Sequence, residues 1–312
     1  MGAPPLVATA LNRAEAASSM DSPPSGPPGS DAPVVRTDAG ASTAIPASLL
    51  GPGDPAAVRR RAFGERLPVV LACDHASAAI PASLASLGLD AAQLRRHIAW
   101  DIGAGGLAES LARRLGVAVV AGGYSRLVID CNRRLEDPTS ILEVSDGTAI
   151  PGNLALSAAQ REGRASGIFQ PYHAALQAEL DIAARRAGPG AQPALVAIHS
   201  FTDVLGGRAR PWHCGILWDR DPRLALPLLA ALRAESGLVV GDNEPYSGRH
   251  PADYTVHTHG ERHGRPHVCI EVRQDLLADA AGIEAWAARL GRVLAPLLAV
   301  AALYRAAGEA GA

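Results

Sequence analysis

The chain has 312 residues, a formal net charge of −2 and 4% aromatic residues. A nearly neutral chain offers no basic field for nucleic acid or for an anionic membrane surface, so its partner must be recognised at a local site. The longest apolar stretch, 294–304, contains Pro296 and is too short to cross a bilayer, which needs about 20 residues. These properties argue against a membrane protein and against a nucleic-acid-binding protein.

The first part of the chain differs in composition from the rest. Residues 1–55 are rich in Ala, Pro, Gly and Ser, with runs such as SPPSGPPGSDAP that can bury almost no apolar surface. We therefore predict a disordered tail over residues 1–55 and a single α/β domain over residues 56–312. The cysteines lie in or beside apolar runs and form no C-x-x-C pair. We expect them to be buried free thiols in a reducing cytoplasm, so the predicted location is cytoplasmic.

Apolar runs alternate with longer helical patterns from residue 59 onward. The predicted strands are 67–72, 117–120, 127–131, 194–198, 214–218, 238–240 and 268–272. The predicted helices are 104–115, 157–187, 222–235 and 282–306. The second of these helices should kink or restart at Pro171. This alternation predicts a mostly parallel sheet covered by helices.

Polar side chains that can do chemistry stand where these strands end. They are Asp74 and His75; Asp130, Asn132 and Arg133; His199 and Ser200; and Glu271 and Arg273. Open α/β sheets place their ligands at the carboxyl ends of strands, and core packing requires none of these groups. The pattern therefore predicts one shared active-site rim. For His199 alone, a hydrogen-bonded structural role remains the alternative to a metal ligand.

Nine segments in order resemble the N-formylglutamate amidohydrolase family over residues from about 49 to 298. They are CDHAS with IP close behind, HIAWDIGA, GYSRLVIDCNR, DPTSILEVSDGT, IPGN, IHSFT, RPWHCGILWDRD, GDNEPYSG and IEVRQDL. That family looks like a relative of the zinc carboxypeptidases and of the aspartoacylase group. The resemblance implies a carboxypeptidase-like fold with a central mixed sheet. It also implies Zn²⁺ or another divalent metal, and hydrolysis of a small N-acyl amino acid such as N-formylglutamate to formate and the free amino acid.

Zinc hydrolysis of an amide needs three protein ligands, an open position for the attacking water and a carboxylate that accepts its proton. His75 and His199 are the natural imidazole ligands. Carboxypeptidase-like enzymes take a further ligand from H-x-x-E, but position 78 here is alanine. Asp101 is our third ligand, because an acidic residue recurs in this segment of the resembling family; a helix N-cap is its alternative role. Asp74 is expected to orient His75.

Glu271 is the predicted general base and acid, with a metal-bound water as nucleophile. Its apolar neighbours should desolvate it and raise its pKa toward the working pH. The alternative is a surface glutamate on an edge strand that pairs with Arg273. The resemblance also gives His259 a possible contact with substrate or oxyanion, whereas the other histidines of HTHGERHGRPH are expected in loops.

An N-acyl amino acid carries an α-carboxylate, which a guanidinium can hold through two parallel hydrogen bonds. Asn132 and Arg133 resemble the Asn-Arg pair with which carboxypeptidases hold that group, and Arg126 is the second candidate cation. A salt bridge to Asp130 is an equally good role for Arg126. The other predicted substrate-binding residues are Glu244, Tyr246 and Arg273.

Two other functions remain open at this point. The first is a different zinc-type hydrolase of N-acyl amino acids or short peptides. The second is a metal-free binding protein of the same fold, which the missing H-x-x-E glutamate leaves open. A serine hydrolase is disfavoured because neither Ser77 nor Ser200 lies in a G-x-S-x-G motif.

Overall fold

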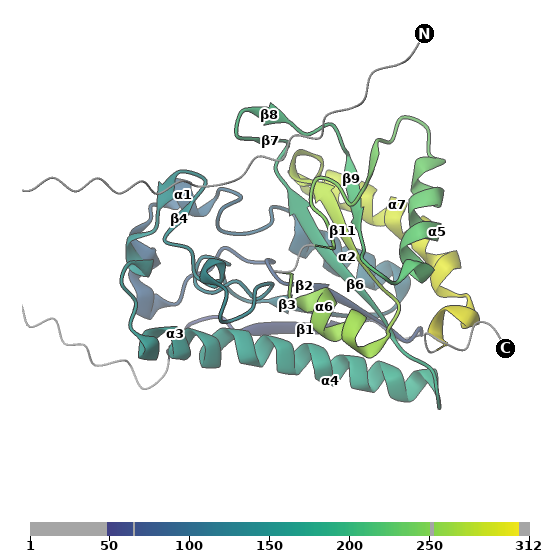
Figure 1. Cartoon of the computed structure of the whole chain (residues 1–312), viewed down its shortest axis with the longest axis horizontal. Helices are drawn as coiled ribbons and strands as arrows, with labels where there is room; N and C mark the ends of the chain where they lie inside the picture. The colour runs from purple at the N-terminus through teal and green to yellow at the C-terminus, as the bar shows by residue number, and fades with distance from the viewer. Residues whose placement is uncertain (1–48, 65, 250–252, 306–312) are drawn as a thin grey trace, which may run out of the picture. The chain divides into compact units, whose positions relative to one another are not determined.

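A computed structural model describes residues 49–64, 66–249 and 253–305 (Figure 1). Most of the predicted tail lies outside the described residues, but residues 49–55 are within them. The Ser83 hydroxyl donates to the Leu49 carbonyl at 2.8 Å, and the Tyr124 hydroxyl donates to the carbonyl of Pro55. Leu49 and Leu50 also pack against buried apolar residues. The packed part of the chain therefore includes this end of the predicted tail.

Seven strands form one mixed sheet in the order β1-β3-β2-β6-β11-β9-β10. They are β1 Val58–Ala62, β2 Val69–Cys73, β3 Ala118–Gly122, β6 Ala194–Phe201, β9 Cys214–Leu217, β10 Val240–Asp242 and β11 His267–Arg273. The neighbours β3, β2, β6 and β11 are parallel, whereas β1 and the β9–β10 pair run the other way. Two small hairpins are β4 Val144–Ser145 with β5 Thr148–Ala149, and β7 Val204–Leu205 with β8 Arg208–Ala209. The predicted mostly parallel mixed sheet of a single α/β domain is confirmed.

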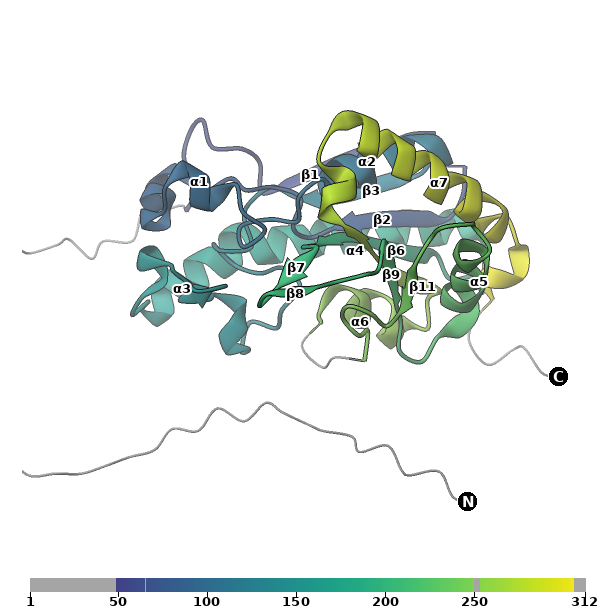
Figure 2. The same cartoon turned by 90° about the horizontal axis from the view of Figure 1, so that it is seen from above.

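Helices cover both faces of this sheet. They are α1 Ala91–Leu94, α2 Ala104–Leu115, α3 Ala158–Arg164, α4 Gln170–Ala187, α5 Pro222–Arg233, α6 Thr255–His259 and α7 Ala280–Leu298. Short 3-10 turns lie at Ala82–Gly88, Pro138–Ser140, Pro151–Asn153, Glu261–His263, Gln274–Leu277 and Ala301–Tyr304. The layer of α2, α5 and α7 buries one face, and α4 with α6 covers the other; Figure 2 shows α2 and α7 above the sheet and α6 below it.

Strand β6 shows how the sequence builds both layers. Successive strand residues point to opposite faces, so Val196 and Ile198 pack with α2, α5 and α7, while Leu195 packs on the α4 side. Every residue of β6 is buried, which explains its nearly continuous apolar composition. The alternation places His199 on the face that α4 and α6 cover.

The predicted helix over residues 157–187 is divided as Pro171 suggested. Helix α3 continues through a π-helical turn at Ala165–Phe169 into α4, and Pro171 lies in the first turn of α4. In that turn its missing N–H and fixed φ cost little. The predicted helix from residue 282 to 306 ends earlier, at Leu298, and the predicted strand 238–240 begins later, at Val240.

The predicted strand 127–131 is wrong, because this apolar run forms a turn. The Ser125 hydroxyl accepts from the amide of Leu127 at 3.1 Å, and the Ser125 carbonyl accepts from the amide of Val128 at 3.0 Å. These local bonds engage amides that a strand would offer to its neighbour. The place beside β3 is taken by β1, whose sequence VRRRA we did not predict as a strand.

No helix within the described ranges is both long enough and apolar enough to span a membrane.

Candidate active site

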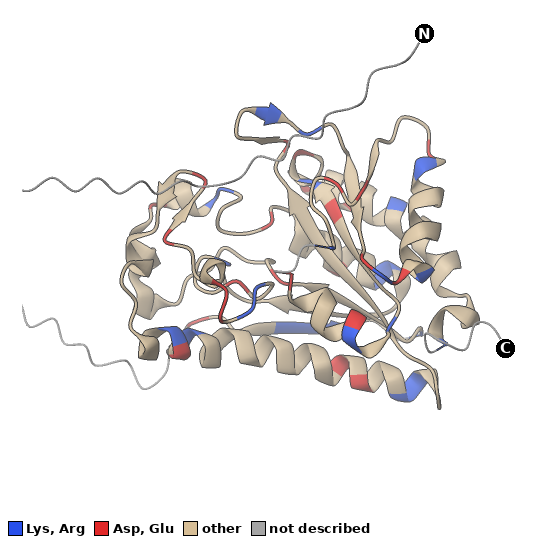
Figure 3. Ribbon diagram, viewed as in Figure 1, with Lys and Arg blue, Asp and Glu red and all other residues tan. Residues whose placement is uncertain are grey.

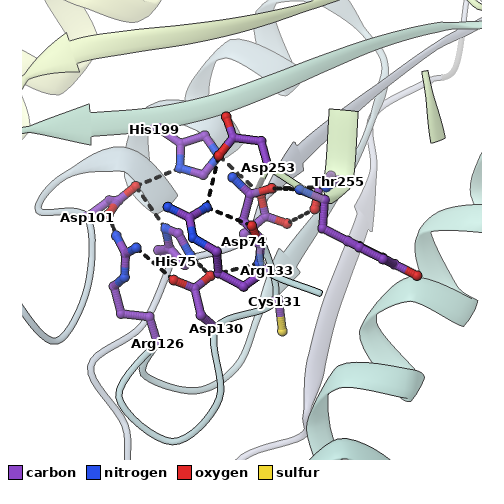
Figure 4. A network of polar contacts seen from close by, with 12 residues as sticks. Asp74, His75, Asp101, Arg126, Asp130, Cys131, Arg133, His199, Asp253 and Thr255 are labelled. Carbon is purple, nitrogen blue, oxygen red and sulfur yellow. Dashed lines mark hydrogen bonds and ion pairs between the residues drawn. The ribbon is translucent and has the colours of Figure 1, made fainter. Parts of the chain in front are cut away.

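The candidate site lies at the carboxyl ends of three neighbouring parallel strands. His75 follows β2, His199 belongs to β6, and Glu271 on β11 is the register partner of His199. Asp101 comes from the turn before α2, and its backbone N–H donates to the carbonyl of His75 at 3.0 Å. That hydrogen bond places the Asp101 carboxylate beside the two imidazoles (Figure 4).

His75, His199 and Asp101 form a buried group that could hold a metal ion. Oδ2 of Asp101 lies 2.8 Å from Nδ1 of His199 and 3.3 Å from Nδ1 of His75. One donor atom from each of the three residues lies within 4.8 Å of the others. Two imidazole nitrogens and a carboxylate oxygen are a donor set that Zn²⁺ accepts. The structure therefore brings together the three ligands predicted from the sequence.

A buried carboxylate holds the far nitrogen of each imidazole. Nε2 of His75 lies 2.7 Å from Oδ1 of Asp130, and Nε2 of His199 lies 3.1 Å from Oδ2 of Asp74. The Thr255 hydroxyl in turn donates to Oδ1 of Asp74 at 2.7 Å. Metal-binding histidines commonly have such partners, which fix the ring and its tautomer. The prediction that Asp74 orients His75 is wrong: Asp74 contacts His199, and Asp130 contacts His75.

The charges of this cluster favour a cation at its centre. Burial alone would lower the pKa of His199, but the hydrogen bonds to Asp101 and Asp74 raise it well above its ordinary value. Burial alone would raise the pKa of Asp101, but the two histidines hold it well below the ordinary range. Each imidazole thus faces two carboxylates, and protons or a metal ion can supply the positive charge that these carboxylates stabilise.

Arg126 is paired with two carboxylates of the cluster. Its guanidinium lies 2.7 Å from Oδ2 of Asp130 and 3.5 Å from Oδ1 of Asp101. Arg126 therefore connects the partner of His75 to the acidic residue of the metal-binding group. This geometry matches the alternative salt-bridge role that the sequence left open for Arg126.

Glu271 is buried at 6% exposure, and its Oε2 has no hydrogen-bond partner among the described residues. Burial raises the pKa of Glu271 to about 7, although the neighbouring His199 opposes this shift. The alternative of a surface glutamate on an edge strand is wrong, because β11 lies between β6 and β9. Arg273 is not its partner but pairs with Asp275 at 2.8 Å.

These groups border a cavity of about 420 Å³. It is lined by His75, Asp101, Arg126, Asn132, Arg133, His199, Ser200, Leu217, Pro245, Tyr246, Ser247, Asp253, Cys269 and Glu271. The three predicted metal ligands, Glu271, and four of the predicted substrate-binding residues therefore share one cavity. Sequence reasoning missed Asp253, because nothing in the run HPADYT distinguishes its acid from a loop residue.

Asn132 and Arg133 are both engaged by the segment that begins α6. The side-chain oxygen of Asn132 accepts from the backbone N–H groups of Tyr254 and Thr255, at 3.0 and 2.9 Å. The Arg133 guanidinium donates to Oδ1 of Asp253 at 2.9 Å. Arg133 therefore lines the cavity while its guanidinium is already paired with the carboxylate of Asp253.

Three predicted site residues are absent from the cavity lining in the described part of the chain: His259, Glu244 and Arg273. His259 lies at the end of α6, where its Nε2 is 3.0 Å from Nδ1 of His173. Burial and the nearby His173 lower the pKa of His259 to about 4. Glu244 is exposed. This geometry brings none of the three side chains to the metal-binding group.

The charged residues of the domain are mixed rather than segregated, as Figure 3 shows. The sequence contains no lysine, so every cation except histidine and the amino terminus is an arginine. A carboxylate ligand in this cavity can therefore be held only by guanidinium groups, imidazoles, neutral donors or a metal.

A helix-covered sheet with a buried polar site at its strand ends is typical of α/β enzymes. The model of the N-formylglutamate amidohydrolase family matches residues 67–278, so the chain belongs to that family and is an amidohydrolase. The crystal structure of a gene product from Agrobacterium tumefaciens is similar to this chain, with 36% sequence identity and a TM-score of 0.75. The match covers 80% of this chain and 98% of that one.

N-formylglutamate amidohydrolase from Ralstonia eutropha JMP134 is 23% identical with a TM-score of 0.60, covering 78% of this chain and 97% of that one. At this identity the likeness shows the fold alone. No curated protein matches the sequence.

Proposed function

We propose that this amidohydrolase is metal-dependent and hydrolyses N-formylglutamate or a closely related N-acyl amino acid, releasing formate and the free amino acid. One observation carries the proposal. Three donor atoms of His75, His199 and Asp101 converge, and the buried carboxylate of Glu271, whose Oε2 has no hydrogen-bond partner among the described residues, borders the same cavity. Family membership supports the choice of N-formylglutamate.

The residues present fit a divalent ion, with Zn²⁺ as our first choice. His75 and His199 would bind through Nδ1, because their Nε2 atoms face Asp130 and Asp74. Asp101 would supply the oxygen ligand in place of the glutamate that H-x-x-E lacks here. When bound, such an ion supplies a Lewis acid for the amide carbonyl and for the attacking water.

Glu271 moves the proton in this proposal. A carboxyl group with a pKa of about 7 is half ionised at neutral pH, so it can accept a proton from water and donate it to the leaving nitrogen. Glu271 is the register partner of His199 on the neighbouring strand, which supports a role next to the proposed metal ligands. Leu217 and Cys269 on the same cavity wall limit hydration of this carboxylate.

Arg133 is proposed to hold the α-carboxylate of the substrate. The Asp253 carboxylate occupies Arg133 in the structure, so the substrate would exchange with it. The side-chain oxygen of Asn132 is used by the start of α6, which leaves Asn132 mainly a positioning role for that segment. Buried free cysteines at positions 73, 131, 214 and 269 support the further proposal of a cytoplasmic location.

Formate release tests the function directly. Purified protein loaded with Zn²⁺ should release formate from N-formyl-L-glutamate in a coupled formate dehydrogenase assay. Chelation should abolish turnover, and added Zn²⁺ should restore it. Absence of formate with Zn²⁺, Mn²⁺, Co²⁺ and Fe²⁺ would exclude the proposed reaction, and a panel of N-acyl amino acids would then identify a different acyl group.

Replacing Arg133 by lysine should chiefly raise KM for N-formylglutamate, because the α-carboxylate contact exists in ground and transition states alike. A charged bidentate contact is worth about 2 to 3 kcal/mol, or roughly 30- to 150-fold in kcat/KM. The α-amide of the same substrate lacks this carboxylate and should lose far less. Steady-state kinetics on both substrates checks the difference. Equal losses on both would make Arg133 a structural partner of Asp253.

Arg126→Ala should weaken metal binding, and a raised KM for the substrate should not be its only effect. Arg126 holds Asp130, which holds His75, and loss of such outer partners typically costs about 10- to 100-fold in metal affinity. Competition with a chromogenic chelator measures the affinity, and circular dichroism checks the fold. If the metal affinity is unchanged and KM is raised, Arg126 binds the substrate and does not support the metal-binding group.

A further inference from the structure

Arg210 contacts the cavity-lining residue Tyr246, and the hydrogen bonds of its guanidinium among the described residues go only to neutral groups. It donates to the Tyr246 hydroxyl at 2.9 Å and to the Thr202 carbonyl at 3.5 Å. Its guanidinium carbon lies 4.8 Å from the ring centre of Tyr246 and 5.8 Å from that of Phe201. None of the ion pairs found in the described ranges includes Arg210, whereas Arg126 and Arg133 both have carboxylate partners.

Two segments of the chain hold Arg210 beside Tyr246. Strand β6 carries His199 and continues into the β7–β8 hairpin, and the Arg210 amide closes that hairpin on the Asp203 carbonyl at 2.8 Å. Tyr246, which lines the cavity, comes from the turn after β10. Arg210 therefore stands between the strand of a proposed metal ligand and the wall formed by Tyr246.

The turn that carries Tyr246 is fixed on the sheet. A Cβ atom at Gly215 would lie 1.8 Å from the carbonyl oxygen of Glu244, so only glycine permits this close approach. The side chain of Asn243 accepts from the amides of Trp218 and Gly248 at 3.1 and 2.9 Å. The Tyr246 hydroxyl is consequently presented to Arg210 by a braced loop, and a ligand group placed there would meet a preorganised pair of donors.

Glutamate differs from most amino acids in its second carboxylate, which lies beyond the reach of a group that holds the α-carboxylate. Arg133, bonded to Asp253, is tied to the segment that contacts Asp74, close to the metal-binding group. Tyr246 is 42% exposed, so it lies toward the mouth of the cavity. In the proposed orientation, the amide of the substrate lies at the metal-binding group and its α-carboxylate lies at Arg133. The side chain of an extended substrate would then point toward the mouth of the cavity.

We infer that Arg210, with the Tyr246 hydroxyl, binds the side-chain carboxylate of the substrate and makes the enzyme selective for N-acyl amino acids with acidic side chains. The inference rests on the proposed function for the orientation of the substrate. The guanidinium of Arg210 has no carboxylate partner among the ion pairs of the described residues, so its charge is available for such a carboxylate, which its planar fork can bind through two hydrogen bonds.

Kinetics on two substrates of similar length test this specificity. Arg210→Ala should raise KM for N-formyl-L-glutamate roughly 10- to 100-fold and leave KM for N-formyl-L-methionine within about twofold. Arg208→Ala is the matched control, because Arg208 is an exposed cation on β8 of the same hairpin. It should change neither value. Equal changes on both substrates in Arg210→Ala would show that Arg210 only supports the Tyr246 loop, and no change on either would also overturn the inference.

A binding measurement separates this inference from the proposed reaction. Calorimetric titration of the full chain with L-glutamate and L-methionine needs no turnover. The wild type should prefer glutamate by about tenfold or more, and Arg210→Ala should lose that preference while Arg208→Ala keeps it. A preference that survives in Arg210→Ala would refute the assignment even if the enzyme proves inactive on N-formylglutamate. A retained Arg210 effect without formate release would instead reject only the reaction.

Discussion

His199→Ala is expected to remove about one equivalent of metal per chain and to reduce activity to background. His199 lies between Asp101 and Asp74, and its loss leaves only two of the three donors. A lost ligand should weaken metal binding by more than the roughly 10- to 100-fold that follows loss of an outer partner. Elemental analysis of protein purified without chelator measures the metal content, and circular dichroism follows the fold.

The same result is expected for His75→Ala, which removes the other imidazole. His263→Ala is the control, because His263 is an exposed histidine in the turn after α6. This control should retain both metal and activity. Undiminished Zn²⁺ in both His75→Ala and His199→Ala would contradict the proposed site, whereas loss of metal in all three variants would point to general destabilisation.

Glu271→Gln is expected to lower kcat by roughly 100-fold or more while metal and substrate still bind. Glutamine keeps the shape of the side chain but cannot accept the proton of the attacking water. Because Oε2 of Glu271 has no hydrogen-bond partner in the described part of the chain, the substitution should disturb little else. Single-turnover kinetics and elemental analysis together separate the chemical step from metal loss.

Glu244→Gln provides the matched control for this experiment. Glu244 is exposed and its side chain is not part of the described cavity lining, so this variant should keep wild-type kcat. Retained turnover in Glu271→Gln would refute its role in proton transfer. A joint loss of metal and turnover would show instead that Glu271 acts on the metal-binding group.

Much of the sheet could be predicted because its strands are buried on both faces. Continuous apolar runs such as VVLAC in β2 and ALVAI in β6 fit a strand between two helical layers. The same reasoning failed for residues 127–131, since burial in the core does not require a strand and the Ser125 hydroxyl supplies a local turn. It also missed β1, where three arginines mark an exposed edge rather than a core strand.

The site was predictable to the extent that its residues follow strands or match the family. His75, His199 and Glu271 stand at strand ends, and the resemblance pointed to Asp101. The pairing of each imidazole with a particular carboxylate was not predictable, because Asp74 is next to His75 in sequence yet contacts His199. Asp253 and Arg210 come from loops, whose positions depend on packing that a one-dimensional pattern does not encode.

The register of β6 and β11 limits which parts of this enzyme can be altered without moving His199 relative to Glu271. His199 and Glu271 are direct partners on adjacent central strands, so the ladder fixes their backbones about 4.8 Å apart. By contrast, Arg210 and Tyr246 sit on a hairpin and a turn that the sheet merely supports. If the proposed roles hold, exchanging the segments 203–210 and 243–248 should change substrate preference without altering the proposed catalytic groups on the sheet. The sheet therefore carries the proposed catalytic groups, whereas loops carry the groups proposed to bind the substrate side chain.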